Sequence, residues 1–212
     1  MLKNLTLEDF IEELGSNSPA PGGGSAAALS ASLAGALVEM VFHLTIGKKE
    51  YTELEKPIQD RIQAAFLQVK NQKNELLELM EKDTEAFLSL MEAYKMPRNT
   101  KEEIEERKAR IEKGNQTAID IPMEVAEKAY ELYEHILLAA EFGNKNAISD
   151  TGVSASLTET AVESALLNVK INALSVKDET YKEELLNKCD LLLRQSKAKR
   201  DGIFNMVERK MR

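Results

Sequence analysis

The chain has 212 residues and a formal net charge of −8, and hydrophobic residues make up 43% of it. This length suits one self-sufficient core, and the single cysteine and modest Gly and Pro content exclude a disulfide scaffold and a collagen-like fibre. Aromatic residues are scarce whereas Ala, Leu, Glu and Lys abound, which favours an all-helical protein. The negative charge argues against a generic nucleic-acid binder, so no nucleic-acid partner is expected.

Helical periodicity and helix-boundary residues divide the chain into about six helices, with no strand signal. Thr6 and Asp9 form a capping box for a short first helix that ends at Gly15. We expect Pro122 to kink or restart the helix around it. The other helical segments are predicted at about residues 25–46, 57–95, 151–176 and 178–212, and at 99–113 and 123–142 as two parts of one stretch interrupted near Pro122. Together they predict a single all-α domain over residues 1–212, folded as an up-and-down bundle.

The helix near residues 57–95 is unusually long and spans roughly 55 Å. Asp83 lies inside it, three residues after Met80 and four before Phe87, so it should lean toward the apolar side. A carboxylate there is costly unless it is paired, and its pKa would rise. This is the profile of a general acid or base, although most aspartates on helices are simply solvated.

Nothing in the sequence predicts a membrane or metal-binding protein. The N-terminus has no signal-peptide pattern, and the most apolar stretch, residues 26–46, carries Glu39 and His43. We therefore expect a cytoplasmic protein without a membrane partner. The two histidines have no metal-ligand spacing, and the lone Cys189 is interpreted as a core thiol.

A glycine-rich turn, PAPGGGS, opens the second predicted helix. Glycines let a ligand approach the backbone closely, and the helix start at Ser25 presents unpaired N–H groups. The turn is interpreted either as a site for an anion or a carbonyl oxygen, or as an ordinary linker. Ten of the next twelve residues, 25–36, are Ala, Ser or Gly. Such a helix suits close packing or a dimer seam, and it would also leave room for a flat ligand.

A second polar turn, GNKNAISD, lies between two predicted helices. Its side chains suit either capping and turn formation or recognition of a heteroaromatic edge. Asp150 or Ser149 is expected to cap the helix that follows. On that helix Asn168 and Asn172 share one face of an apolar run, so they should bond a neighbouring helix or a ligand.

Several motifs in the same order resemble the cyclodeaminase/cyclohydrolase family: SPAPGGGSAAALSASLAGALVEMV, GKKEY, KDTEAF, GNKNAISDTGVSASL and LLNVKIN. The resemblance covers nearly the whole chain. It implies an all-helical homodimer that acts on one-carbon adducts of tetrahydrofolate without a metal or a bound prosthetic group. It implies that Asp83 is the proton donor and acceptor. The residues it places at the folate site are Pro21, Gly22, Gly23, Gly24, Ser25, Lys48, Lys49, Tyr51, Asn144, Asn146, Ser149 and Asp150.

The resemblance allows two reactions. One is 5-formiminotetrahydrofolate cyclodeamination, which releases ammonia and forms 5,10-methenyltetrahydrofolate, and the other is hydrolysis of that methenyl bridge. Lys48, Lys49 or the basic C-terminal segment 194–212 is predicted to hold a glutamate tail, which would matter for polyglutamylated folates. The alternative is a non-catalytic helical dimer that binds folate or serves as a scaffold.

Overall fold

The structure, a computed structural model, describes all 212 residues and contains seven α-helices and no strand. The prediction of an all-α fold is confirmed. Two helices are short and five are long enough to form the bundle. The bounds are α1 Leu7–Leu14, α2 Gly23–Thr45, α3 Lys49–Thr52, α4 Lys56–Lys95, α5 Lys101–Phe142, α6 Ile148–Asn172 and α7 Glu179–Lys210.

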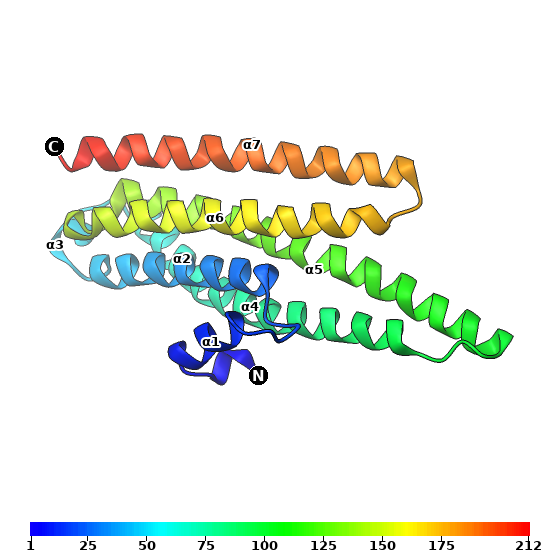
Figure 1. Cartoon of the computed structure of the whole chain (residues 1–212). Helices are drawn as coiled ribbons and strands as arrows, with labels where there is room; N and C mark the ends of the chain where they lie inside the picture. The colour runs from blue at the N-terminus through cyan, green and yellow to red at the C-terminus, as the bar shows by residue number, and fades with distance from the viewer.

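The five long helices run up and down, and each is antiparallel to the next (Figure 1). Helix α2 packs against α4, α5 and α6, whereas α7 covers α5 and α6 from the opposite side. One core cluster of 39 buried residues links these helices. The far ends of α4 and α5 continue beyond the bundle as a helical hairpin (Figure 1).

Small residues let α2 approach its neighbours closely, as the sequence predicted. A Cβ added to Gly35 would lie 3.3 Å from Cβ of Lys73 on α4, tighter than ordinary side-chain contacts. Serine hydroxyls then bridge the helices: Ser32 donates to the Lys73 carbonyl over 3.0 Å, and Ser154 on α6 donates to the Ala34 carbonyl over 2.9 Å. Close packing therefore satisfies hydroxyls that would otherwise be buried without partners.

Pro122 does not restart a helix, so that part of the expectation was wrong. Helix α5 runs without a break from Lys101 to Phe142. Proline has no N–H, which leaves the carbonyl of Ala118, four residues earlier, without its helical donor. The amide of Asn172 on α6 donates to that carbonyl over 2.6 Å. A side chain from another helix thus supplies the missing hydrogen bond, which sequence periodicity could not show.

Two smaller expectations were also wrong. Neither Asp150 nor Ser149 caps α6, because that helix begins at Ile148 behind a short 3-10 turn and has no side-chain cap. Phe87 was placed in the buried stripe of α4 but is 40% exposed, whereas Met80 is 2% exposed. The exposure of Phe87 follows from its position just before α4 leaves the bundle.

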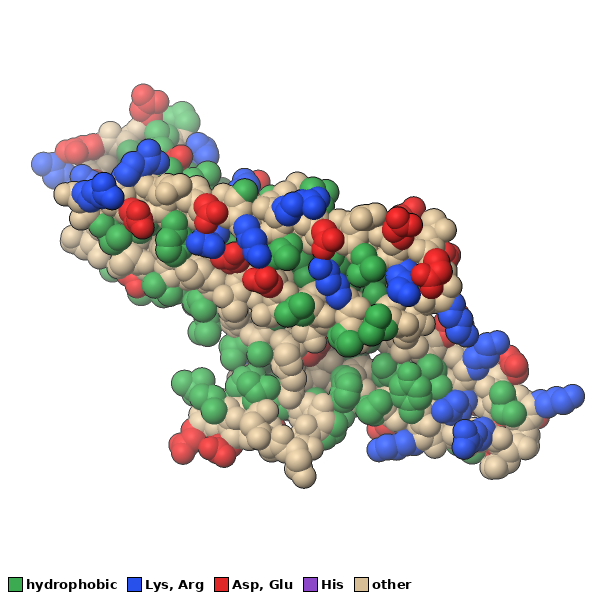
Figure 2. Space-filling model, turned by 45° about the horizontal axis from the view of Figure 1, so that its top comes forward, with side chains coloured by type: hydrophobic (Ala, Val, Ile, Leu, Met, Phe, Trp, Pro, Cys, Tyr) green, Lys and Arg blue, Asp and Glu red, His purple; other side chains and the backbone are tan.

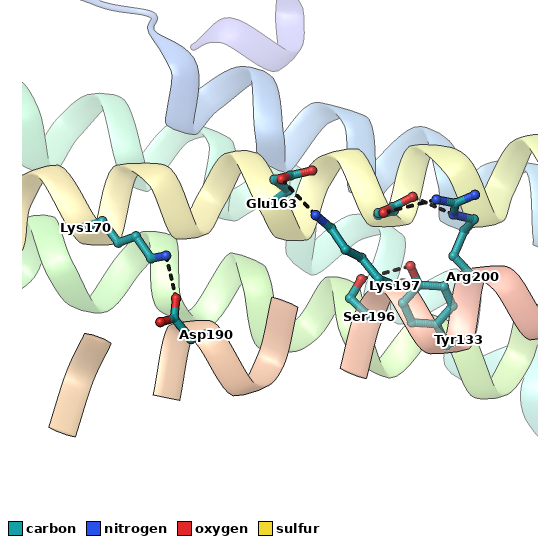
Figure 3. Close-up of polar contacts among 8 residues, drawn as sticks. Tyr133, Glu163, Lys170, Asp190, Ser196, Lys197 and Arg200 are labelled. Atoms are coloured by element: carbon teal, nitrogen blue, oxygen red, sulfur yellow. Dashed lines mark hydrogen bonds and ion pairs between the residues drawn. The ribbon is translucent and has the colours of Figure 1, made fainter. Parts of the chain in front are cut away.

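Polar contacts fasten α7 to α6 and α5 (Figure 3). The fully buried Ser196 hydroxyl lies 2.9 Å from the Tyr133 hydroxyl. Beside them Nε of Arg200 lies 2.7 Å from a Glu159 oxygen, and Lys197 pairs with Glu163. Much of the basic C-terminal segment is therefore used within the fold.

Helix α2 has the length and mean hydropathy of a membrane-crossing segment, although no such segment was expected from the sequence. Of its most apolar window, 56% is buried inside the bundle. Its neighbours α4, α5 and α6 account for this burial, as for the core helix of a helical domain.

Candidate active site

Asp83 lies on α4 where this helix passes the beginning of α2, and its side chain is half-buried. Burial raises the pKa of the Asp83 carboxyl above its ordinary value of 3.8, as the sequence predicted. No charged side chain is among the influences on this pKa. Burial, and not a neighbouring acidic residue, therefore increases the proton affinity of this carboxyl group.

The glycine-rich turn leaves the space that this carboxyl group occupies. A Cβ on Gly24 would come within 2.8 Å of all three atoms of the Asp83 carboxyl group, so the Asp83 side chain would have to move to make room for it. At Gly22, by contrast, an added Cβ would meet no atom within 4 Å. The present position of the Asp83 carboxyl group thus depends on the missing Cβ of Gly24, whereas Gly22 is the N-cap residue of α2 and is exposed.

Two hydroxyl groups complete the surroundings of Asp83. Ser25 is fully buried, and its Oγ donates to Asp83 Oδ2 over 2.8 Å. The same Oγ lies 3.1 Å from the Thr84 hydroxyl. The side chain and the backbone N–H of Ser25 both favour the carboxylate and partly oppose the effect of burial on the pKa of Asp83. The positive end of the α2 dipole acts in the same direction.

Asn168 on α6 lies beside this cluster, although the sequence analysis did not assign it to the site. Its Nδ2 would be 3.5 Å from a Cβ on Gly23, and that nitrogen donates to the Ser164 carbonyl over 2.9 Å. Its Oδ1 has no hydrogen-bond donor within the chain. The sequence showed Asn168 only as an asparagine in an apolar run. The packing shows that Asn168 lies beside the glycine turn, whereas Asn172 donates a hydrogen bond to α5.

The surface around this part of the molecule is hollowed. Figure 2 shows two projections below the bundle, the N-terminal segment with α1 and the α4–α5 hairpin, with a hollow between them. Hydrophobic side chains line both sides of the hollow in this view. Exposed apolar residues of the two segments include Ile11, Leu14, Phe87 and Leu88.

The other predicted site residues lie at the opposite end of α2. Lys48, Tyr51, Asn144 and Asn146 line a cavity of about 510 Å³ beside the C-terminus of that helix. With 1.5 Å per residue, the length of α2 puts this cavity roughly 33 Å from the glycine turn. Within one chain, therefore, the structure groups Pro21, Gly22, Gly23, Gly24 and Ser25 with Asp83 but separates the second set from them.

Contacts at this second end are mainly those of a turn. The Asn144 side chain accepts from the Asn146 backbone over 2.9 Å and donates to the Leu44 carbonyl over 3.0 Å. Lys49 is exposed and pairs with Glu53 on its own turn. Ser149 is exposed and Asp150 is half-buried in the first turn of α6. The Lys210 ammonium donates to the carbonyls of Ala140 and Glu141, both over 2.6 Å.

Comparison with known proteins identifies this arrangement. Residues 6–191 match the model of the formiminotransferase-cyclodeaminase family. The chain belongs to this family. Its motifs at the glycine turn, around Asp83 and at the asparagine turn all fall inside the matched range.

Relatives in the family cover the chain from end to end. A methenyltetrahydrofolate cyclohydrolase of Methylorubrum extorquens is 37% identical over 100% of both chains. A mouse formimidoyltransferase-cyclodeaminase is 33% identical over 98% of this chain, which spans 38% of that longer protein. The crystal structure of a formiminotetrahydrofolate cyclodeaminase from Thermotoga maritima matches with a TM-score of 0.80 at 27% identity, over 99% of this chain and 97% of that chain.

Proposed function

We propose that this chain is an enzyme of tetrahydrofolate one-carbon chemistry in which Asp83 carries the proton. Family membership and the relatives named for cyclohydrolase and cyclodeaminase activity support an enzyme of this kind. The observation that carries the role of Asp83 is its carboxyl group, half-buried against the glycine turn, with burial holding its pKa above the ordinary value. A carboxyl group with raised proton affinity holds its proton more readily and can both accept and return it during a reaction.

Cyclodeamination needs such a group twice. N10 of the folate attacks the formimino carbon on N5, and Asp83 takes the proton that N10 loses. Asp83 then returns this proton to the amino group of the tetrahedral intermediate, so the C–N bond breaks, ammonia leaves and the methenyl bridge remains. Holding N5 and N10 together in one pocket adds the advantage of proximity.

Cyclohydrolysis uses the same carbon and the same carboxylate. Water adds to the methenyl carbon while Asp83 accepts its proton. The proton then passes to one bridging nitrogen as its C–N bond opens, and the hydroxyl group on the carbon releases its own proton to solvent. A formyl group is left on the other nitrogen. One pocket with one proton carrier therefore suits both reactions. In this proposal the substrate is a tetrahydrofolate derivative, and the enzyme uses no prosthetic group.

The decisive experiment assays both substrates with the same protein. Purified wild-type chain and Asp83→Asn are each given 5-formiminotetrahydrofolate and 5,10-methenyltetrahydrofolate, and the methenyl absorbance band is followed. We expect turnover of at least one substrate by the wild type and a fall of about 10²–10⁴-fold in Asp83→Asn, the usual contribution of a positioned acid–base group. A folded Asp83→Asn protein with full turnover would falsify the role of Asp83. Binding without turnover by the wild type would favour the folate-binding scaffold instead.

We further propose that the protein is a cytoplasmic homodimer formed through the exposed face of α2. Leu33, Met40 and Leu44 lie on this face and are 51%, 36% and 41% exposed. Two α2 helices crossing antiparallel would place the Lys48 and Asn144 cavity of one protomer near the glycine turn of the other. Leu33→Glu is expected to give a monomer in light scattering, whereas the same change at Leu67, which is exposed on α4, should leave the mass unchanged.

The predicted binding of the folate glutamate tail by Lys48 can be tested at the cavity that this residue lines. Charge reversal of Lys48 should raise the KM for a polyglutamylated folate more than the KM for the monoglutamate. Equal effects on both substrates would count against a role in holding the tail.

A further inference from the structure

The hydroxyl of Ser25 is the central member of a directed chain of hydrogen bonds. A serine hydroxyl has one proton, and in Ser25 this proton is donated to Asp83 Oδ2 over 2.8 Å. The contact of 3.1 Å with Thr84 Oγ1 must then run the other way, so that Thr84 donates to Ser25. The order of donation is therefore Thr84 to Ser25 to Asp83.

We propose that Ser25 is a positioning residue of the reaction, which holds the Asp83 carboxyl group in one orientation, and that Thr84 acts through it. This inference rests on the proposed role of Asp83 as proton carrier. Ser25 is 0% exposed, so its side chain can affect the reaction only through its hydrogen bond to Asp83. The resemblance to the family places Ser25 at the folate site, and the hydrogen bond gives it a specific role there.

Asp83 has few other interactions that could fix its orientation. Gly24 and Ser25 from α2 contact the carboxyl group, Thr84 reaches it only through Ser25, and none of the three carries a charge. No side-chain cation pairs with Asp83. Without the Ser25 hydroxyl, the carboxyl group would keep only the backbone N–H of that residue as a donor. Proton transfer is sensitive to such geometry, because donor and acceptor must stay within hydrogen-bond distance.

The test compares Ser25→Ala with Ser32→Ala. Ser32 lies on the same helix, is 4% exposed and donates to the Lys73 carbonyl, so its removal deletes a matched α2–α4 hydrogen bond away from Asp83. We expect Ser25→Ala to lower kcat about 10- to 100-fold, as for loss of a hydrogen bond to a charged group, with KM within twofold of wild type. The acid limb of its pH–rate profile should move to higher pH, because the carboxylate loses a donor. Ser32→Ala should leave both readouts unchanged.

Thr84 provides a second and independent measurement. Thr84→Val removes the hydroxyl with little change in volume, and Thr84→Ser retains it. We expect a smaller loss of kcat in Thr84→Val, recovery in Thr84→Ser, and a double variant Ser25→Ala/Thr84→Val no worse than Ser25→Ala alone. This non-additivity is the signature of a residue that acts through another.

The outcomes separate this inference from the proposed function. If Asp83→Asn is inactive but Ser25→Ala keeps the wild-type kcat and acid limb, the positioning role is overturned while the proton carrier stands. Equal effects in Ser25→Ala and Ser32→Ala, or a change in KM alone, also overturn it. If Ser25→Ala does not fold, Ser25→Cys replaces it in the double variant with Thr84→Val. Losses of kcat that are additive in that double variant would overturn the chain of donation. Full activity of Asp83→Asn refutes the proposed function itself.

Discussion

Two clusters in this protein pair a fully buried serine with an ionisable side chain, and they differ in exposure and in neighbouring charge. Ser25 donates to Asp83 between α2 and α4, and Ser196 bonds the hydroxyl of Tyr133 between α7 and α5. Burial raises the pKa of both Asp83 and Tyr133. The Tyr133 cluster (Figure 3) is closed, because Tyr133 is 1% exposed, and it has the neighbouring Arg200–Glu159 pair.

The Asp83 cluster is open where the Tyr133 cluster is closed. Gly24 leaves room for the carboxyl group, the Asp83 side chain is only half-buried, and no cation neutralises it. The difference teaches that a serine–acid hydrogen bond and a raised pKa do not by themselves indicate chemistry. Partial exposure and the lack of a compensating charge distinguish the Asp83 carboxyl group from the closed contact at Tyr133.

The largest effect on turnover is expected at Gly24, which leaves room for the Asp83 carboxyl group. Gly24→Ala should lower turnover by about 10²-fold or more, because its Cβ would displace the carboxyl group and misplaced catalytic groups cost that much. Gly202→Ala on α7 is the matched control, since its Cβ would also meet nothing within 4 Å, and it should keep most activity. Steady-state assays of the two variants check this, and similar losses in both would contradict the contact.

The closed cluster should respond in stability and not in activity. Tyr133→Phe leaves the Ser196 hydroxyl buried without its partner, which should lower the free energy of unfolding by about 1–3 kcal/mol. Turnover should stay at the wild-type level. Urea unfolding and the folate assay on the same samples test the difference, and lost turnover without lost stability would break the comparison.

A third polar contact, that of Asn172 with the carbonyl freed by Pro122, is predicted to be purely structural. Asn172→Ala should cost about 1 kcal/mol of unfolding free energy, because the Ala118 carbonyl loses its donor. In a Pro122→Ala background the backbone N–H can supply that bond, so the same change should cost much less. Equal costs in both backgrounds in a double-mutant cycle would show that Asn172 does not replace the missing N–H.

The smallest effect is the pH dependence of stability at Asp83. Its pKa is raised in the folded state, so the charged form costs stability above that pKa, and the cost is lost as the pH falls toward 3.8. Asp83→Asn should therefore melt at a higher temperature than wild type near pH 7, with no gain below the ordinary pKa. Asp190→Asn should do the opposite at neutral pH, because the hydrogen bond with Lys170 lowers the pKa of Asp190. Melting curves between pH 3 and pH 8 test both signs.

Sequence patterns predicted the parts of the site that depend on local chemistry. The position of Asp83 on a long amphipathic helix indicated a partly buried carboxyl group, and three consecutive glycines indicated a turn with an open backbone. The pattern did not show that these two features touch, because 58 residues separate Ser25 from Asp83 along the chain. Thr84 and Asn168 were missed as members of the cluster for the same reason.

The sequence by itself determined that this protein is an all-helical bundle of the formiminotransferase-cyclodeaminase family, because helical periodicity and motif order are local properties of the chain. Tertiary structure alone decided that α5 continues through Pro122, since the replacing donor comes from α6. It also decided that the predicted site residues divide between the two ends of α2. Neither result is local, because hydrogen bonds between helices depend on packing that no single segment encodes.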